Sequence, residues 1–169
     1  MIIIGIDPGV EGAIAFIDDG YLQIYDMPML GEGKGAEIDH VGLKNILDPD
    51  DSVCIAYIEQ QIPMPKQNSI STASCFKNYG ILLGVIRTMG ISSSYVTPNT
   101  WKKAMGVLMP RGFKGTQHAR KKASKAIALR KASQLFPLHD FGKKDGQAEA
   151  ALIAEYGRRL NGAQKTKEE

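Results

Sequence analysis

The sequence predicts an α/β domain, in which strands at the start of the chain are followed by helices and further strands. One observation is the apolar, β-branched segment 2–6, which short Gly-containing turns join to segments 13–17 and 21–27 as a β-meander. The other is the almost entirely apolar segment 53–58, which is typical of a strand buried on both faces. Segments of helical character follow at 69–89, 116–136 and 148–156.

Start and stop signals define the remaining elements. Asp39 is a typical N-cap for a short helix at 40–47, which follows a flexible Gly-rich loop at 31–35. The helix at 69–89 ends at Gly90. The elements expected after it, in order, are a strand at 93–97, a helical turn after Pro98 that carries Trp101, Lys102 and Lys103, a loop at 106–115 and the helix at 116–136.

The length and composition indicate one soluble domain. A chain of 169 residues can bury a sizeable core, and we expect a single domain over 1–162 with a polar tail at 163–169. No apolar run reaches membrane-spanning length, and the start lacks a signal-cleavage pattern, so we expect an intracellular protein. Cys54 and Cys75 lack CxxC spacing, and neither is expected to be catalytic.

The charge of the chain is strongly asymmetric. Residues 1–60 carry two basic and twelve acidic side chains, a net charge of −10, whereas residues 61–169 carry nineteen basic and six acidic ones, a net charge of +13. Generic surface lysines can produce such a difference, but its size favours a polyanion such as nucleic acid as the partner of the basic part.

Single carboxylates end two of the predicted buried strands. Asp7 follows segment 2–6, and Glu59 follows segment 53–58. If the two strands lie side by side, the two acids come close together, and both can ionise only with a cation between them. The alternatives are that Asp7 only caps its turn and that the pair arises by chance. Gly9 and Gly12 match neither the Rossmann nor the Walker spacing of phosphate-binding turns.

Two further acids lie at the start of the last helix. Asp145 and Glu149 are four residues apart and share one face if the helix begins at or before Asp145. The alternative is that Asp145 is an N-cap and Glu149 a favourable first-turn acid. Together with Asp7 and Glu59 they form the ligand set of hard divalent cations, with Mg²⁺ preferred for phosphate substrates. Two such ions can activate a water and stabilise the leaving oxygen in phosphodiester cleavage.

Basic and polar side chains of the second half are candidates for contacts with a phosphate backbone. The helix at 116–136 is basic on its outer face, and a solvated basic face is the alternative interpretation. The predicted DNA-binding residues are Gln60, Lys66, Lys102, Lys103, Arg111, Lys114, Arg120, Lys121, Lys122 and Lys125.

Three motifs in order resemble the RuvC family of Holliday junction resolvases, most of all its bacteriophage and chloroplast branches. They are Gly5-Ile-Asp7-Pro-Gly9, Tyr57-Ile-Glu59-Gln60, and Asp145 with Glu149-Ala-Ala-Leu-Ile-Ala, and the similarity spans about residues 2–157. The resemblance implies a ribonuclease H-like fold, with a mixed five-stranded sheet flanked by α-helices. It also implies a homodimer that makes symmetric nicks in four-way DNA junctions and leaves 5′-phosphate ends.

The resemblance also assigns roles to residues. Asp7, Glu59, Asp145 and Glu149 match the catalytic, metal-binding acids, which implies two Mg²⁺ ions, with Mn²⁺ as a substitute, and no nucleotide cofactor. The location expected is the cytoplasm: the nucleoid, or the host cytoplasm if a phage encodes the chain. The helix with Gly80 and Gly84 is the expected dimer face.

The chain departs from the family in two ways. The last two acids are four residues apart rather than three, which leaves Asp140 as a substitute for Asp145. The loop after Glu59 carries Ile62 and Met64 where the family often has an aromatic wedge. Apart from these departures, His118 and His139 are possible proton carriers, although both are expected to be surface residues.

Three other functions compete with a junction resolvase. The first is a general endonuclease that debranches forks and flaps, and the second is a junction-binding scaffold without activity. The third is an actin-like ATPase or sugar kinase, which shares the Asp-Pro-Gly turn but needs a second lobe that 169 residues do not easily supply.

Overall fold

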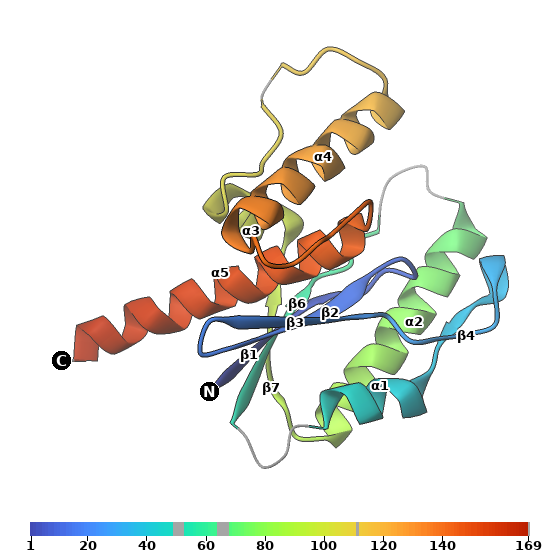
Figure 1. The fold of residues 1–169 in the computed structure, drawn as a ribbon. Helices are drawn as coiled ribbons and strands as arrows, with labels where there is room; N and C mark the ends of the chain where they lie inside the picture. The colour runs from blue at the N-terminus through green and yellow to red at the C-terminus, as the bar shows by residue number, and fades with distance from the viewer. Residues whose placement is uncertain (49–52, 64–67, 111, 169) are drawn as a thin grey trace.

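The computed structural model describes residues 1–48, 53–63, 68–110 and 112–168, which form a central sheet between two layers of helices (Figure 1). The sheet has five strands in the order β3-β2-β1-β6-β7. The pairs β1–β2 and β2–β3 are antiparallel, whereas β1–β6 and β6–β7 are parallel. The strands are β1 Ile2–Asp7, β2 Ala13–Asp18, β3 Tyr21–Asp26, β6 Cys54–Glu59 and β7 Ser92–Val96. This architecture confirms the mixed five-stranded sheet flanked by α-helices.

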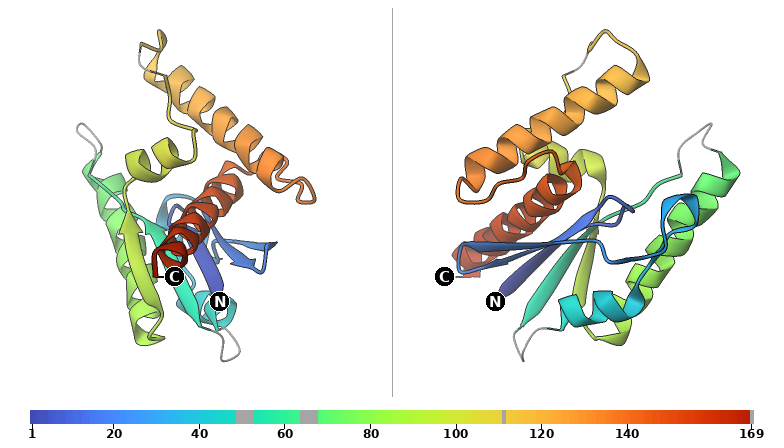
Figure 2. Two further views of the ribbon diagram at one scale, coloured as in Figure 1. Left: turned by 90° about the vertical axis from the view of Figure 1, so that its left-hand side faces the viewer. Right: turned by 45° about the vertical axis from the view of Figure 1, so that its right-hand side comes forward.

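The helices divide between the two faces of the sheet (Figures 1 and 2). One face is covered by α1 (His40–Leu47) and α2 (Ser69–Thr88). The other is covered by α5 (Asp145–Glu168), on which α3 (Pro98–Ala104) and α4 (Gln117–Leu135) pack. In the part of the chain that the structure describes, no helix is long and apolar enough to cross a membrane.

Side-chain alternation in β1 and β6 separates the two cores. Ile4 of β1 and Ile58 of β6 are fully buried in the cluster under α1 and α2. Ile3 and Tyr57 belong to the cluster under α5. Because successive side chains of a strand point to opposite faces, each strand contributes to both cores, as the nearly continuous apolar sequence predicts.

Capping residues place several helix ends where the sequence predicts them. The Asp39 side chain accepts a hydrogen bond from the Val41 amide at 3.0 Å and starts α1. Gly90, with a φ of 68°, follows α2 and its C-cap Met89. The left-handed conformation there favours glycine, which explains why the helix ends at this point.

Two features differ from the sequence-based expectation. The Gly-rich segment carries a 3₁₀ turn, η1 (Gly33–Gly35), inside a small hairpin of β4 (Met29–Leu30) and β5 (Glu37–Ile38). The buried Asn78 of α2 holds this hairpin, because it accepts from the Ile38 amide at 2.9 Å and donates to the Ala36 carbonyl at 3.2 Å. Helix α5 continues to Glu168, past the end expected at 156. The domain limit at 162 stays a prediction.

Candidate active site

Asp7 and Glu59 end neighbouring parallel strands, as expected. The register pairs Ile6 with Ile58, so that each strand closes with its acid one residue later. Because side chains alternate along a strand, Asp7 points to the same face of the sheet as Ile3, and Glu59 points to the same face as Tyr57. Both acids therefore belong to the face that α5 covers. Asp7 Oδ1 also accepts the Gly9 amide at 3.3 Å, so the aspartate caps its own turn as well.

Glycines let α5 approach these strand ends closely. A Cβ on Gly5 of β1 would lie 2.2 Å from the Ala154 amide nitrogen and 2.3 Å from the Ala150 carbonyl oxygen. A Cβ on Gly146 would lie 2.0 Å from the Glu11 carbonyl oxygen in the turn after β1. Such contacts are far inside van der Waals distance. The backbone of α5 therefore rests directly on β1, and this brings Glu149 to the sheet edge that carries Asp7.

The electrostatics show that Asp7, Glu59 and Glu149 form one cluster. The pKa of Asp7 is raised to about 8 by burial, then by the charges of Glu149 and Glu59. Burial, with the charge of Glu149, also raises the pKa of Glu59. Three half-buried carboxylates from three separate segments thus repel one another, and a nearby cation would relieve that repulsion. We call these three residues the acid cluster.

Two consecutive residues of α3 hold the two glutamates. Trp101 Nε1 donates to Glu59 Oε2 at 2.6 Å, and Lys102 Nζ lies 2.8 Å from Glu149 Oε1. Lys102 Nζ also lies 5.0 Å from the centre of the Trp101 ring. The lysine charge lowers the pKa values of Asp7 and Glu59. Lys102, predicted from the sequence as a DNA-binding residue, therefore serves as the counter-ion of the acid cluster in this structure.

The side chain of Asp145 contacts α4 rather than the acid cluster. Its Oδ2 lies 2.5 Å from Lys125 Nζ of α4, and this contact raises the pKa of Lys125. Glu11 and Glu149 also act on Lys125, whereas Asp145 is not among the groups that shift the pKa of Asp7. The structure therefore brings three of the four predicted acids together and leaves Asp145 paired beside them.

The acid cluster has the ligand chemistry of a hard divalent cation, although its side chains are not arranged as a complete metal site. Among the described residues, no three His, Cys, Asp or Glu side chains are grouped closely enough to hold a metal ion. Lys102 pairs with Glu149 Oε1, an oxygen that a cation would need, and Lys125 pairs with Asp145 Oδ2 beside the cluster. Carboxylate oxygens with excess negative charge nevertheless fit Mg²⁺ or Mn²⁺.

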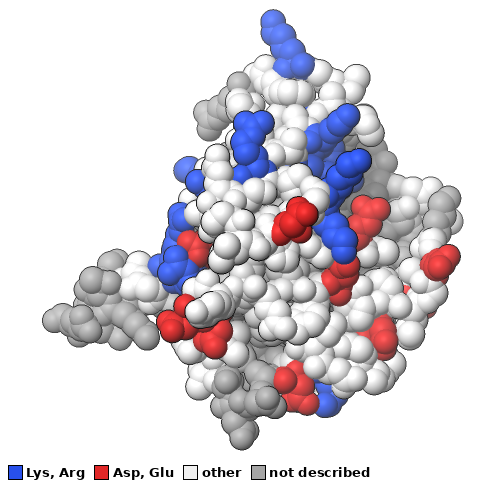
Figure 3. Space-filling model, viewed as in Figure 1, with Lys and Arg blue, Asp and Glu red and all other residues white. Residues whose placement is uncertain are grey.

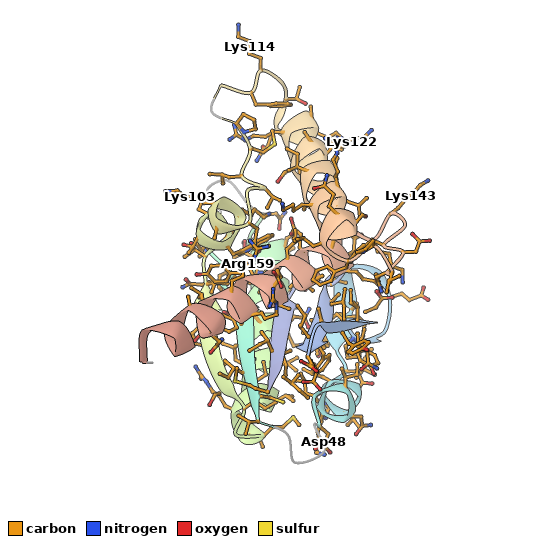
Figure 4. The ribbon with its side chains drawn as sticks, turned by 60° about the vertical axis from the view of Figure 1, so that its left-hand side comes forward. Asp48, Lys103, Lys114, Lys122, Lys143 and Arg159 are labelled. Atoms are coloured by element: carbon orange, nitrogen blue, oxygen red, sulfur yellow. The ribbon has the colours of Figure 1, made fainter. Side chains whose placement is uncertain are left out.

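Basic side chains surround this end of the molecule. In Figure 3, Lys and Arg gather over the part formed by α3 and α4, and most acidic side chains lie away from it. Lys103, Lys114 and Lys122 point outward there, whereas Asp48 lies at the opposite end (Figure 4). The exposed basic members of the predicted DNA-binding set, none of which pairs with a described acid, are Lys103, Lys114, Arg120, Lys121 and Lys122.

The other sequence candidates occupy varied positions. Gln60 is exposed, and its amide donates to the Val96 carbonyl at 2.8 Å. Asp140 Oδ1 accepts the Gly142 amide at 2.9 Å, so it caps a local turn. His118 is exposed, as expected. His139 is half-buried against Phe141 rather than on the surface, with ring centres 4.5 Å apart.

Some of the predicted residues lie outside the described part of the chain. They are Lys66, Arg111 and Met64. Ile62, the other aliphatic residue of the loop after Glu59, is described and exposed.

Sequence reasoning missed the role of α3 in the site. Lys102 was predicted to contact DNA, and Trp101 was predicted only to lie in a helical turn. Nothing in their local pattern indicates contacts with Glu59 and Glu149, which are 42 and 47 residues away. One signal was present: β7 follows β6 in a parallel arrangement, and α3 begins directly after β7. A helix that starts at the carboxyl end of β7 begins at the same sheet edge as Glu59.

Comparisons with known proteins show what the fold resembles. No family model and no curated protein matches the sequence. Among solved structures, Thermus thermophilus RuvC in complex with a Holliday junction substrate matches with a TM-score of 0.59 and 15% identity, over 95% of this chain and 96% of the other. A further Thermus thermophilus RuvC structure matches with a TM-score of 0.52 and 15% identity, over 95% and 97% of the two chains. The chain therefore has the RuvC-like, ribonuclease H-like fold that its motifs predict.

Proposed function

We propose that this protein is a metal-dependent endonuclease that cuts branched DNA, with four-way junctions as its preferred substrate. The observation that carries the proposal is the acid cluster of Asp7, Glu59 and Glu149, in which burial and then mutual repulsion raise the pKa of Asp7 to about 8. The likeness to a RuvC structure with a bound Holliday junction supports the choice of substrate by analogy of fold.

The acid cluster would hold Mg²⁺, with Mn²⁺ as a substitute, and Asp145 would join it as the fourth ligand of a two-ion site. Such ions supply activation of a water and charge stabilisation at the leaving oxygen during phosphodiester hydrolysis. The chain's own residues position the substrate. Lys103 on α3 and Lys122 on α4 lie at the end of the molecule that carries the acids, where they would bind phosphates and hold the DNA against the site.

We further propose a homodimer, which would place two active sites on one junction and yield paired nicks with 5′-phosphate ends. Among the described residues, no neighbouring atom lies within 4 Å of a Cβ added to Gly80 or Gly84 of α2, so this stretch of the helix is open towards the described part of the chain. A hollow of about 590 Å³ lies beside it, lined by Ile81, Val85 and Met89 of α2 and by residues of α1. A second copy that packs there would bury this apolar surface.

The test is cleavage of a labelled immobile four-way junction, with matched fork, flap and linear duplex, in Mg²⁺, Mn²⁺ or EDTA. Symmetric, ligatable nicks that require the metal would establish a junction resolvase. Equal cutting of forks and flaps would instead establish a general debranching nuclease. Asp7→Asn should bind the junction without cutting it. Tight binding without cutting by the unmodified protein in either metal would refute the nuclease and favour a junction-binding scaffold.

A further inference from the structure

Trp101 makes an unusual contact for a core residue. Its side chain is fully buried, with 0% of its surface exposed, yet its indole N–H points at the acid cluster rather than at a backbone carbonyl. A buried Trp needs some hydrogen-bond acceptor, and here the acceptor is Glu59 Oε2 at 2.6 Å. We propose that Trp101 is a positioning residue of the divalent-cation site, which fixes one oxygen of Glu59 and leaves the other to bind the cation. This inference rests on the proposed metal-dependent function.

The fold explains how Trp101 reaches Glu59. Strand β7 pairs with β6 in parallel, and its last residue, Val96, lies opposite Glu59. The Gln60 amide donates to the Val96 carbonyl at 2.8 Å and locks this register. Thr97 then caps α3, with Pro98 in its first turn, so the helix starts directly above the end of β6. Trp101 lies one turn into α3. The pairing of β6 with β7 and the cap at the start of α3 therefore fix its position over Glu59.

The chemistry of indole suits a positioning role and little else. The indole N–H is a donor only, so Trp101 is neither a ligand of the metal ion nor a proton carrier in the reaction. Its hydrogen bond favours the ionised form of Glu59, and it lowers the carboxyl pKa against the opposing effects of burial and Glu149. Outer contacts of this kind orient the carboxylates of metal sites, and their loss typically weakens metal binding about 10- to 100-fold.

Trp101 also provides a direct measurement, because it is the only Trp in the chain. Its ring has the Lys102 ammonium 5.0 Å from its centre, and its N–H is bonded to a candidate ligand. A cation that binds Glu59 and displaces Lys102 from Glu149 changes both the hydrogen bond of the indole N–H and the contact of the ring with the Lys102 ammonium. We expect the fluorescence of the DNA-free protein to change saturably with Mg²⁺ or Ca²⁺, and Glu59→Gln to abolish this change.

The decisive experiment measures Mn²⁺ affinity without DNA, from the electron paramagnetic resonance signal of free Mn²⁺. Two forms of the protein lack the N–H donor. One is Trp101→Phe, and the other carries benzothienylalanine at position 101, an analogue in which sulfur replaces the indole N–H. Both should bind Mn²⁺ about 10- to 100-fold more weakly than the unmodified protein. The sulfur analogue retains the ring shape, so it separates the lost hydrogen bond from lost packing.

Leu82→Ala is the matched control, since Leu82 is fully buried on the opposite face of the sheet. It should lower the melting temperature and leave Mn²⁺ affinity unchanged. Unchanged affinity in the sulfur analogue would overturn the positioning role of Trp101 while the metal site stands. If the unmodified protein binds no Mn²⁺ at millimolar concentration, the proposed metal-dependent function fails as well, so the two failures are distinguishable.

Discussion

Lys102 and Glu149 form a largely buried ion pair across two helices. Lys102 Nζ lies 2.8 Å from Glu149 Oε1, and the two side chains are 18% and 14% exposed. The charge of Lys102 also lowers the pKa values of Asp7 and Glu59, so one lysine acts on all three carboxylates. The Lys102 side chain therefore places a positive charge at the carboxylates to which a divalent ion would bind.

Lys102→Met should destabilise the metal-free protein, because Glu149 would then be buried beside two acids without a counter-ion. We expect a loss of about 1–3 kcal/mol in the free energy of unfolding, or about 2–4 °C in Tm per kcal/mol. Mg²⁺ should recover more stability in this variant than in the unmodified protein. Thermal melts in EDTA and in Mg²⁺ measure both effects. Lys103→Met, which removes an exposed neighbouring lysine, is the control, and equal melts for the two variants would contradict the prediction.

The raised pKa of Asp7 predicts a pH-dependent stability in EDTA. The folded protein binds the Asp7 proton more tightly than the unfolded chain does, since the carboxyl pKa is about 8 in one and near 3.8 in the other. Its contribution to stability is therefore complete below about pH 4 and is lost as the pH rises towards 8. The Asp7→Asn variant has no carboxyl group at this position, so it should not lose this stability as the pH rises. It should be more stable than the unmodified protein at pH 8, by about 2–5 kcal/mol, and nearly equal at pH 4. Parallel melting curves across that range would refute the assignment.

Asp145 and Lys125 can be tested as a pair. Both side chains are about one-third exposed, so their ion pair should contribute less than about 1 kcal/mol to stability. If Asp145 is the fourth ligand, Asp145→Asn should stop cleavage as completely as Asp7→Asn without unfolding the protein. Lys125→Met breaks the same ion pair but should retain cleavage and only weaken DNA binding. Equal cleavage rates in the two variants would show that Asp145 acts only through Lys125.

Much of this site could be predicted from sequence because its acids are tied to local patterns. Asp7 and Glu59 each end an apolar strand, and such strands pair in the centre of a sheet, so their proximity follows from the pattern. Glu149 follows from helical spacing and from the family motif. The sequence does not predict which basic residue or hydrogen-bond donor contacts each acid. Lys102 and Lys125 differ in no local feature from the exposed lysines beside them.

The parts of the fold that were missed have similar causes. The β4–β5 hairpin has only two residues per strand, and it is held by Asn78 from a helix 40 residues away. Such a contact leaves no periodic signal in the sequence. The sequence beyond Gly157 is mostly polar, so its pattern predicts a helix end near Tyr156, close to where burial ends, although the backbone of α5 continues to Glu168.

Gly5→Ala should disturb both the fold and the site. The new Cβ would lie 2.2–2.3 Å from backbone atoms of Ala150 and Ala154, so α5 must move away from β1. We expect destabilisation of about 3 kcal/mol or more, together with weaker cation binding, because Glu149 moves with α5. Gly162→Ala, near the far end of α5, is the control, since its Cβ meets no described atom within 4 Å and the change favours helix. Melting and Mn²⁺ titration of both variants test this, and a neutral Gly5→Ala would contradict the packing described.

The basic face of α4 should contribute to DNA affinity through phosphates rather than bases. Lys122→Ala should weaken binding to junctions of any sequence and reduce the slope of log Kd against log salt concentration by about 1. Lys44→Ala is the charge-matched control, since Lys44 belongs to α1 and pairs with Asp48, at the end of the molecule away from α4 (Figure 4). Junction-binding titrations at several salt concentrations, with the cleavage-blocking Asp7→Asn change in every protein, measure both. Equal slopes for the two lysine variants would remove α4 from the DNA interface and leave α3 and the loop that follows it as the candidate contact surface.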